Sequence, residues 1–206
     1  MKIKVCGLNN YENISNVIIA GADYIGFIFH KGSPRYFNNA LDFDEVRKIR
    51  TKKVGVFVNE NIYSVLDKIA HYDLDLIQLH GNESPEYCSE LGKYIKTIKA
   101  FGIDENFDFN LAYNYADKVD YFLFDTASSD HGGSGKAFDH KLLNKYELNT
   151  PFFLSGGISL ENIENIKQLN FKQLIGIDLN SKFEISPGIK EASKVKQFIK
   201  QLNENN

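Results

Sequence analysis

Residues 2–6 read Lys-Ile-Lys-Val-Cys, and this alternating strand pattern ends at a turn that begins with Gly7. Further apolar segments of strand length lie at 23–29, 53–58, 75–79, 95–100, 120–125, 151–155 and 174–179. Segments of helical periodicity alternate with them, at 10–20, 42–51, 60–71, 84–92, 106–115, 138–146, 159–168 and 190–203. Strict alternation of strand and helix predicts right-handed crossovers and a parallel sheet.

Eight such units in 206 residues favour a closed (β/α)8 barrel, a TIM barrel, as a single compact domain spanning residues 1–206. At about 26 residues per unit, most connecting loops must be short. The rival architecture is an open doubly wound sheet, which usually has fewer strands. A dinucleotide-binding sheet of that kind carries G-x-G-x-x-G after its first strand, whereas this chain has Cys6-Gly7-Leu8-Asn9-Asn10 there.

The composition limits the classes of partner. A net charge of −3, with both signs interspersed, provides no basic stripe for nucleic acid. The two cysteines lie far apart, and no leader or long apolar span is present, so we expect a cytoplasmic protein with reduced thiols and no membrane contact. The expected partner is a small anionic metabolite, bound by a monomer or a homodimer.

Polar residues stand where strands end, which in a barrel is the face that carries the active site. Cys6 closes the first strand and Asp125 the sixth, and together they suggest a base and an acid facing one substrate. Alternation places Lys4 on the same inward face as Cys6. His80 follows the fourth strand beside Gln78, and Asp178 lies at the end of the eighth.

Each of these residues also has a structural interpretation. Cys6 can be a small core residue, and Asp125 can cap a helix. Lys4 can pair with Asp178 or supply a positive charge to the Cys6 thiol. His30, His71, His80, His131 and His140 show no zinc-like spacing with each other or with the cysteines, so no metal site is predicted.

Glycine-rich segments follow the late strands, where barrels of this type bind phosphate through backbone N–H groups. Ser155-Gly156-Gly157 follows the seventh strand and Asn180-Ser181 the eighth. Gly133 belongs to a third stretch, 132–136, in a long loop that we expect to fold over bound ligand. That stretch is not a P-loop, because Ala137 stands where Ser or Thr would bind magnesium.

The loop after the second strand carries Ser33-Pro34-Arg35-Tyr36. Arg35 offers a planar fork that matches a carboxylate, although a solvated surface arginine is equally consistent with the local sequence.

These residues are part of an ordered series of motifs that resembles the phosphoribosylanthranilate isomerase family over essentially the whole chain. The motifs are Val5-Cys6-Gly7-Leu8, Gly26-Phe27-Ile28-Phe29 with Ser33-Pro34-Arg35-Tyr36, Gln78-Leu79-His80-Gly81, Phe124-Asp125-Thr126, Gly132-Gly133-Ser134-Gly135, Ser155-Gly156-Gly157, and Gly176-Ile177-Asp178-Leu179-Asn180-Ser181 followed by Glu184 and Ser186-Pro187-Gly188-Ile189-Lys190. One departure is Lys182-Phe183, where the family usually has a glycine after the serine.

The resemblance implies a tryptophan-pathway isomerase that performs an Amadori rearrangement without cofactor or metal. Cys6 would be the general base, without forming a covalent intermediate, and Asp125 the general acid. Arg35 would hold the anthranilate carboxylate, with His80 and Asp178 as further substrate-binding residues. The phosphate would lie against Gly133, Gly156, Gly157, Asn180 and Ser181.

Two alternatives remain at the level of sequence. One is the isomerase of histidine synthesis, which performs the same reaction but resembles a longer barrel with an aspartate at the position of Cys6. The other is a binding or scaffold protein that has kept the barrel without catalysis.

Overall fold

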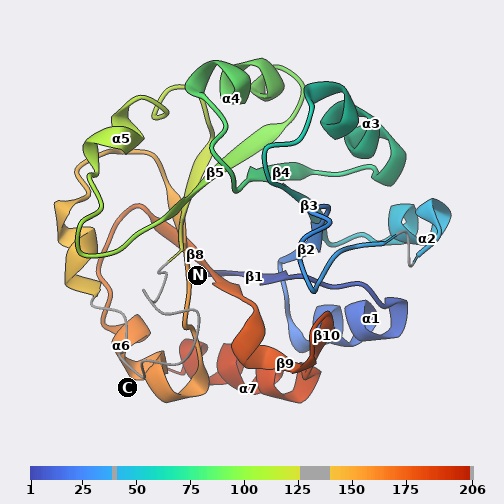
Figure 1. The fold of residues 1–206 in the computed structure, drawn as a ribbon. Coiled ribbons are helices and arrows are strands. Elements are labelled where there is room, and N and C mark those ends of the chain that lie inside the picture. Colours follow the sequence, from blue (N-terminus) through green and yellow to red (C-terminus); the bar gives the residue numbers. More distant parts are fainter. Residues whose placement is uncertain (39–40, 126–139, 205–206) are drawn as a thin grey trace.

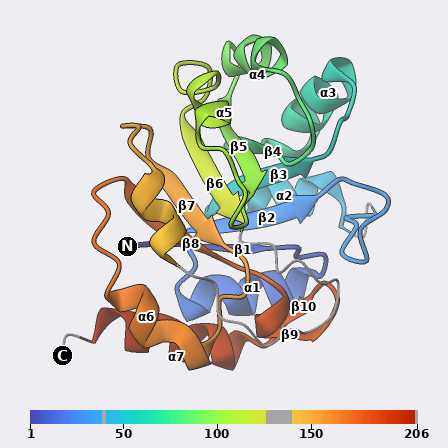
Figure 2. The same cartoon turned by 60° about the vertical axis from the view of Figure 1, so that its left-hand side comes forward.

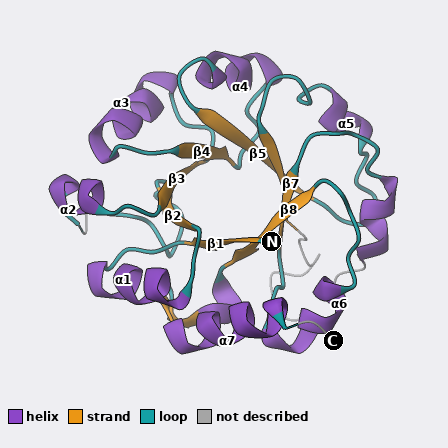
Figure 3. Ribbon diagram, turned by 180° about the vertical axis from the view of Figure 1, so that it is seen from behind, coloured by secondary structure: helices purple, strands orange, loops and turns teal. Residues whose placement is uncertain are grey.

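The computed structural model describes residues 1–38, 41–125 and 140–204, and these form a closed barrel of eight parallel strands ringed by helices (Figures 1 and 3). The barrel strands are β1 (Lys2–Cys6), β2 (Tyr24–Ile28), β3 (Lys52–Phe57), β4 (Leu76–Leu79), β5 (Lys96–Gly102), β6 (Tyr121–Asp125), β7 (Phe152–Ser155) and β8 (Leu174–Leu179). Each strand pairs with the next, and β1 pairs with β8, with Lys4 opposite Asp178. The predicted (β/α)8 barrel is confirmed.

The outer layer contains α1 (Tyr11–Ala20), α2 (Phe43–Lys48), α3 (Ile62–Tyr72), α4 (Pro85–Gly92), α5 (Asn110–Tyr113), α6 (Ile163–Lys167) and α7 (Ala192–Asn203), with 3-10 helices η1 (His140–Lys145), η2 (Leu160–Asn162) and η3 (Ser181–Phe183). A short antiparallel hairpin of β9 (Glu184–Ser186) and β10 (Ile189–Lys190) follows β8 and lies beside α1 and α7 (Figure 2).

Side chains alternate between two layers of core, as the strand pattern predicts. Ile3 and Val5 of β1 pack outward against the helices, as do Phe122 and Phe124 of β6. The barrel interior is filled by Tyr24, Val54, Leu76, Ile98, Ala100, Leu123 and Phe153. This apolar filling occupies the middle of the barrel, so the polar residues of the strand ends form the floor of the mouth above it.

Three of the predicted outer helices differ in the structure, and one outer element was not predicted. The helix expected over 106–115 is only the single turn α5. The Asp108 side chain accepts a hydrogen bond from the Asn110 backbone N–H at 2.9 Å, which starts the helix there instead of continuing one from residue 106. The helix expected over 138–146 is the 3-10 helix η1, and the segment 159–168 is divided between η2 and α6. The hairpin after β8 was not predicted.

The opposite, N-terminal end of the barrel carries a repeated side-chain bond that we call the aspartate bracket. An aspartate just before an even-numbered strand accepts the backbone N–H at the start of the preceding odd-numbered strand. The pairs are Asp23 with Ile3 at 2.9 Å, Asp75 with Lys53 at 2.8 Å, and Asp120 with Thr97 at 2.9 Å. Each bracket therefore joins one strand–helix–strand unit at its base.

Asp120→Ala is expected to lower the free energy of unfolding by about 1 kcal/mol, because the N–H of buried Thr97 loses its acceptor. Asp120→Asn, which keeps an oxygen acceptor, should lose less. Urea unfolding of the three proteins measures the difference. Equal stability of the wild type and Asp120→Ala would show that the bracket contributes nothing.

Candidate active site

The C-terminal mouth of the barrel contains a cavity of about 300 Å³. Its walls come from β1, β2, β3, β4, β6, β7 and β8 and from the loops after β2, β3, β4 and β8. The lining residues are Cys6, Ile28, His30, Ser33, Arg35, Val56, Val58, Gln78, His80, Asp125, Ser155, Asp178 and Asn180. An adjoining hollow of about 100 Å³ shares four of these residues and extends toward the loops after β7 and β8. Every predicted site residue that the structure describes therefore lines one of these two adjoining hollows.

Cys6 lies at the end of β1 and is buried, with 3% of its surface exposed. It pairs with Gly26 of β2, where an added Cβ would approach the Cys6 Sγ to 2.8 Å. The glycine therefore makes room for the thiol. Burial raises the pKa of Cys6, and the positive charge of Lys4 opposes this only in part.

Lys4 fulfils both of the roles that the sequence left open. Its Nζ donates to Asp178 Oδ1 at 2.9 Å, and both side chains are almost fully buried. Its positive charge also acts on the Cys6 thiol and lowers the pKa of that thiol, against the effect of burial. Burial lowers the pKa of Lys4, but the charges of Asp178 and Cys6 outweigh it, so the pKa is raised and the lysine stays cationic. Asp178 therefore keeps a positive charge beside the thiol.

Asp125 closes β6 on the opposite side of the mouth, and its Oδ2 is 3.6 Å from the His80 Nε2. Burial raises the pKa of Asp125, opposed by Lys4, so its protonated form is favoured relative to a solvated aspartate. Burial and Lys4 both lower the pKa of His80, so its imidazole is neutral at pH 7. The other ring nitrogen, Nδ1, is 3.0 Å from Gln78 Nε2.

Arg35 lies at the edge of the cavity, above Gly7. A Cβ on Gly7 would approach the Arg35 side chain to 2.8 Å, and Gly7 has φ +77°, which favours glycine. Arg35 donates Nε and Nη2 to the two carboxylate oxygens of Glu184, at 2.8 and 2.7 Å. The guanidinium is therefore fixed in position by Glu184 and is not the solvated surface arginine that the local sequence also allowed.

Glu184 and Lys190 of the β9–β10 hairpin were not predicted as site residues, although both stand in the motif after β8. Lys190 is buried and binds Glu184, and it donates to Asn180 Oδ1 at 2.7 Å. The hairpin thus connects Arg35 to the loop after β8. The Pro187-Gly188 turn signal after β8 was the available signal for this hairpin.

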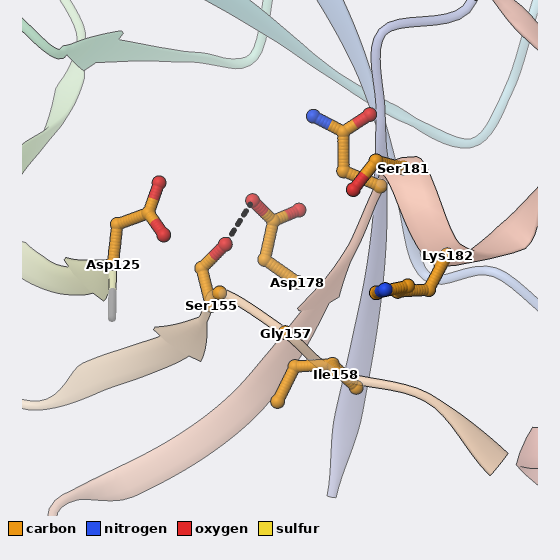
Figure 4. A pocket seen from close by; sticks show the side chains of 9 residues that line it. Asp125, Ser155, Gly157, Ile158, Asp178, Ser181 and Lys182 are labelled. Carbon is orange, nitrogen blue, oxygen red and sulfur yellow. Dashed lines mark hydrogen bonds between the residues drawn. The ribbon is translucent and has the colours of Figure 1, made fainter. Parts of the chain in front are cut away.

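The predicted phosphate end is the smaller hollow (Figure 4). Gly156 and Gly157 both have positive φ, +86° and +61°, which brings the backbone after β7 to the cavity wall. Asn180, Ser181 and Lys182 face it from the loop after β8. Lys182, the departure from the family pattern, adds a positive charge there. Gly133 lies outside the described residues.

The described residues include no group of three or more His, Cys, Asp or Glu side chains arranged to hold a metal ion. Among the helices that the structure describes, none is both long and apolar enough to cross a membrane.

Comparison with known proteins gives a consistent relationship. The family model described as N-(5'phosphoribosyl)anthranilate (PRA) isomerase matches residues 3–201. The N-(5'-phosphoribosyl)anthranilate isomerase of Parabacteroides distasonis is 47% identical over 98% of this chain and 93% of its own length.

Solved structures agree with the sequence match. A structure of monomers generated from the dimeric phosphoribosylanthranilate isomerase of Thermotoga maritima superposes with a TM-score of 0.82, 30% identity and full coverage of both chains. A phosphoribosylanthranilate isomerase in complex with reduced 1-(o-carboxyphenylamino)-1-deoxyribulose 5-phosphate also has a TM-score of 0.82 and 30% identity, over 98% of each chain. On the family match, the sequence identity and the shared barrel, the chain belongs to the N-(5'-phosphoribosyl)anthranilate isomerase family.

Proposed function

We propose that the chain carries out the reaction of its family in tryptophan biosynthesis, with Cys6 as general base and Asp125 as general acid. The substrate is N-(5-phosphoribosyl)anthranilate, and the product is 1-(2-carboxyphenylamino)-1-deoxyribulose 5-phosphate. One observation carries the assignment of roles. The thiol of β1 and the carboxyl of β6 open into the same 300 Å³ cavity, which extends from Arg35 toward the glycines after β7.

The proposed chemistry needs two proton transfers. Asp125 gives its proton to the furanose ring oxygen, the bond from that oxygen to C1 breaks, and a protonated Schiff base forms at C1. The Cys6 thiolate then removes the proton from C2. The electron pair of that C–H bond forms the C1–C2 double bond and neutralises the nitrogen, and the resulting enolamine tautomerises to the ketone. No redox partner is required.

Both ends of the substrate are anionic, and a cation lies at each end of the hollow, Arg35 at one and Lys182 at the other. Arg35 is the proposed partner of the anthranilate carboxylate. The backbone at Gly156 and Gly157, with Asn180, Ser181 and Lys182, is the proposed site of the phosphate. His80 and Asp178 line the walls between them. Gly133 stays a prediction for the phosphate site.

The assembly and setting of the protein are also proposals. We infer a cytoplasmic enzyme that acts as a monomer or homodimer on a small-molecule substrate. The Thermotoga maritima relative is described as dimeric. Light scattering after size-exclusion chromatography distinguishes the two states.

Rescue of a tryptophan auxotroph that lacks this isomerase tests the activity in cells. We expect the wild-type gene to restore growth and the Cys6→Ala gene to fail at equal soluble expression. A soluble wild-type protein that does not rescue growth would contradict the proposed function. Assay of the purified protein with the aminoaldose of histidine synthesis separates the related isomerase activity.

Arg35→Ala is expected to raise KM by about 10- to 100-fold while kcat changes less, because a charge-assisted bond to the carboxylate is lost in the ground state and the transition state alike. Steady-state kinetics measure this split. Arg47→Ala is the control, since Arg47 binds the carbonyls of Ala70 and His71 in the outer layer. An unchanged KM for Arg35→Ala would remove Arg35 from the anchor.

A further inference from the structure

Lys99 of β5 is a buried cation that the proposed mechanism does not use. Its neighbours Ile98 and Ala100 face the barrel interior, so Lys99 points into the layer between barrel and helices. The corresponding outward positions of β6 are Phe122 and Phe124. Lys99 is only 2% exposed. Taking an ammonium out of water costs several kcal/mol unless it is well paired, so its partners decide what it contributes.

The partners of Lys99 are concentrated around one residue. Its Nζ donates to the Gly81 carbonyl at 2.7 Å and to the Leu79 carbonyl at 3.2 Å, the residues on either side of His80. It also contacts Glu83 Oε2 at 3.0 Å and the Ala100 carbonyl at 3.1 Å. An ammonium has three protons, so these four acceptors share them and leave the cation fully coordinated.

Glu83 holds the same loop from the other direction. Its side chain is almost fully buried, and its carboxylate accepts the Gly81 N–H at 2.9 Å and the Asn59 N–H at 2.8 Å. Both peptide groups of Gly81 are therefore held by the ion pair, the carbonyl by Lys99 and the N–H by Glu83. No side chain fits at Gly81, where an added Cβ would lie about 2.4 Å from the Asn59 side chain.

The residue between these restraints is His80. Its own N–H donates to the Phe57 carbonyl at 2.8 Å. Hydrogen bonds therefore hold the main chain at Leu79, His80 and Gly81. Its ring reaches the other side of the sheet, into the cavity, where Nε2 is 3.6 Å from the Asp125 carboxylate. The ion pair and the cavity thus lie on opposite sides of the same short segment.

We propose that the buried Lys99–Glu83 ion pair is a positioning device that fixes the His80 imidazole against Asp125. Lys99 and Glu83 touch no substrate and act through His80. The proposal rests on the assignment of Asp125 as general acid. Gln78 Nε2 can only donate to Nδ1, so the neutral imidazole carries its proton on Nε2 and directs it at a carboxyl oxygen of Asp125, an alignment that requires the ring to be held in place.

Lys53 shows that burial of a lysine in this layer is not sufficient for such a role. It is also buried on the outer face of its strand, β3, with 4% of its surface exposed. Its contacts are the Ile49 carbonyl at 3.3 Å, Asp73 at 3.6 Å and Asp75 at 3.8 Å. All of them lie at the N-terminal end of the barrel, so Lys53→Met is a matched control for Lys99→Met.

The test compares Lys99→Met, Glu83→Gln and Lys53→Met in turnover and in nuclear magnetic resonance of His80. We expect the first two variants to lose about 10- to 100-fold in kcat with KM changed less than threefold, since a displaced His80 no longer keeps Asp125 in the aligned geometry for proton transfer. Lys53→Met should keep the wild-type kcat. In the ligand-free protein, the nitrogen shifts of His80 should report one tautomer in the wild type and a mixture in the first two variants.

Charge alone predicts a different result. The His80 ring shares the cavity side with Lys4 of β1, Asp125 of β6 and Asp178 of β8, while the charges of Lys99 and Glu83 act on it from behind its main chain. Lys99 lowers its pKa and Glu83 raises it. A purely electrostatic role would therefore shift the pKa of His80 in opposite directions in Lys99→Met and Glu83→Gln. A positioning role lowers kcat in both.

Several results would overturn the proposal. The first is a kcat of Lys99→Met and of Glu83→Gln that lies within threefold of the kcat of Lys53→Met. The second is a kcat that rises in one of these two variants and falls in the other. The third is a single His80 tautomer that is the same in the wild type and in all variants. If Lys99→Met does not fold, Glu83→Gln decides by the same measurements. The His80 spectrum needs no turnover, so an inactive wild-type protein would contradict the proposed function while the positioning role is still tested.

Discussion

Cys6→Ala is expected to lower kcat by about 10²- to 10⁴-fold, with KM changed only a few fold, because the base is needed for proton removal and contributes little to ground-state binding. Stopped-flow or steady-state fluorescence of substrate consumption measures the rate. Near-normal turnover in Cys6→Ala would show that another group removes the C2 proton.

The chain offers a matched control for this substitution. Cys88 is the other cysteine, buried in α4, and burial raises its pKa to about 12, so it stays a thiol. Cys88→Ala makes the same substitution in the outer core, so it should lower the free energy of unfolding without changing kcat. A comparable loss of kcat in both variants would indicate a general loss of structure.

Asp125→Asn is expected to lower kcat by about 10²- to 10⁴-fold as well, because asparagine keeps the shape of the side chain but has no proton to give to the ring oxygen. Asp120→Asn makes the same exchange at the other end of β6 and should leave kcat unchanged. Near-normal turnover in Asp125→Asn would remove Asp125 from the role of general acid.

The pH dependence of kcat/KM separates the two roles further, since it reports the free enzyme. The proposed mechanism needs protonated Asp125 together with ionised Cys6. Burial raises both pKa values, and the pKa of Cys6 remains the higher. Only a small fraction of the enzyme therefore has protonated Asp125 and ionised Cys6 together at any pH. As pH rises between the two pKa values, the gain in thiolate cancels the loss of protonated acid, and the wild-type profile is flat.

The two variants should therefore give profiles of opposite slope across that interval. The residual kcat/KM of Asp125→Asn should rise tenfold per pH unit, following the thiolate of Cys6. That of Cys6→Ala should fall tenfold per pH unit, following loss of the proton from Asp125. Parallel profiles in the two variants would contradict the assignment of one base and one acid.

Much of the barrel follows from local sequence because its strands are short, apolar and buried. β1 and β8 have the predicted bounds, and the other barrel strands differ by one or two residues at an end. Alternation placed Lys4 and Cys6 inside the barrel correctly. The helical segments were less predictable, since the residues around α5 bond to the local backbone instead of extending a helix.

The candidate site was predictable where a residue ends a strand, and not where it depends on a distant partner. Cys6 and Asp125 could be found from strand position alone. Arg35 and Glu184 are 149 residues apart, and nothing local to either indicates the pair. Lys99 looks like an ordinary exposed strand lysine until the carbonyls that surround it are known. Such contacts are set by closure of the barrel rather than by any one segment.

The aspartate brackets also bear on where the chain can be divided. They join residues 20, 22 and 23 positions apart, within β1–α1–β2, β3–α3–β4 and β5–α5–β6. No bracket crosses from α4 to β5, so a break near Lys93 would leave two on one fragment and the third on the other. The region between α4 and β5 is therefore a natural place for new termini in a circularly permuted or split form of the enzyme.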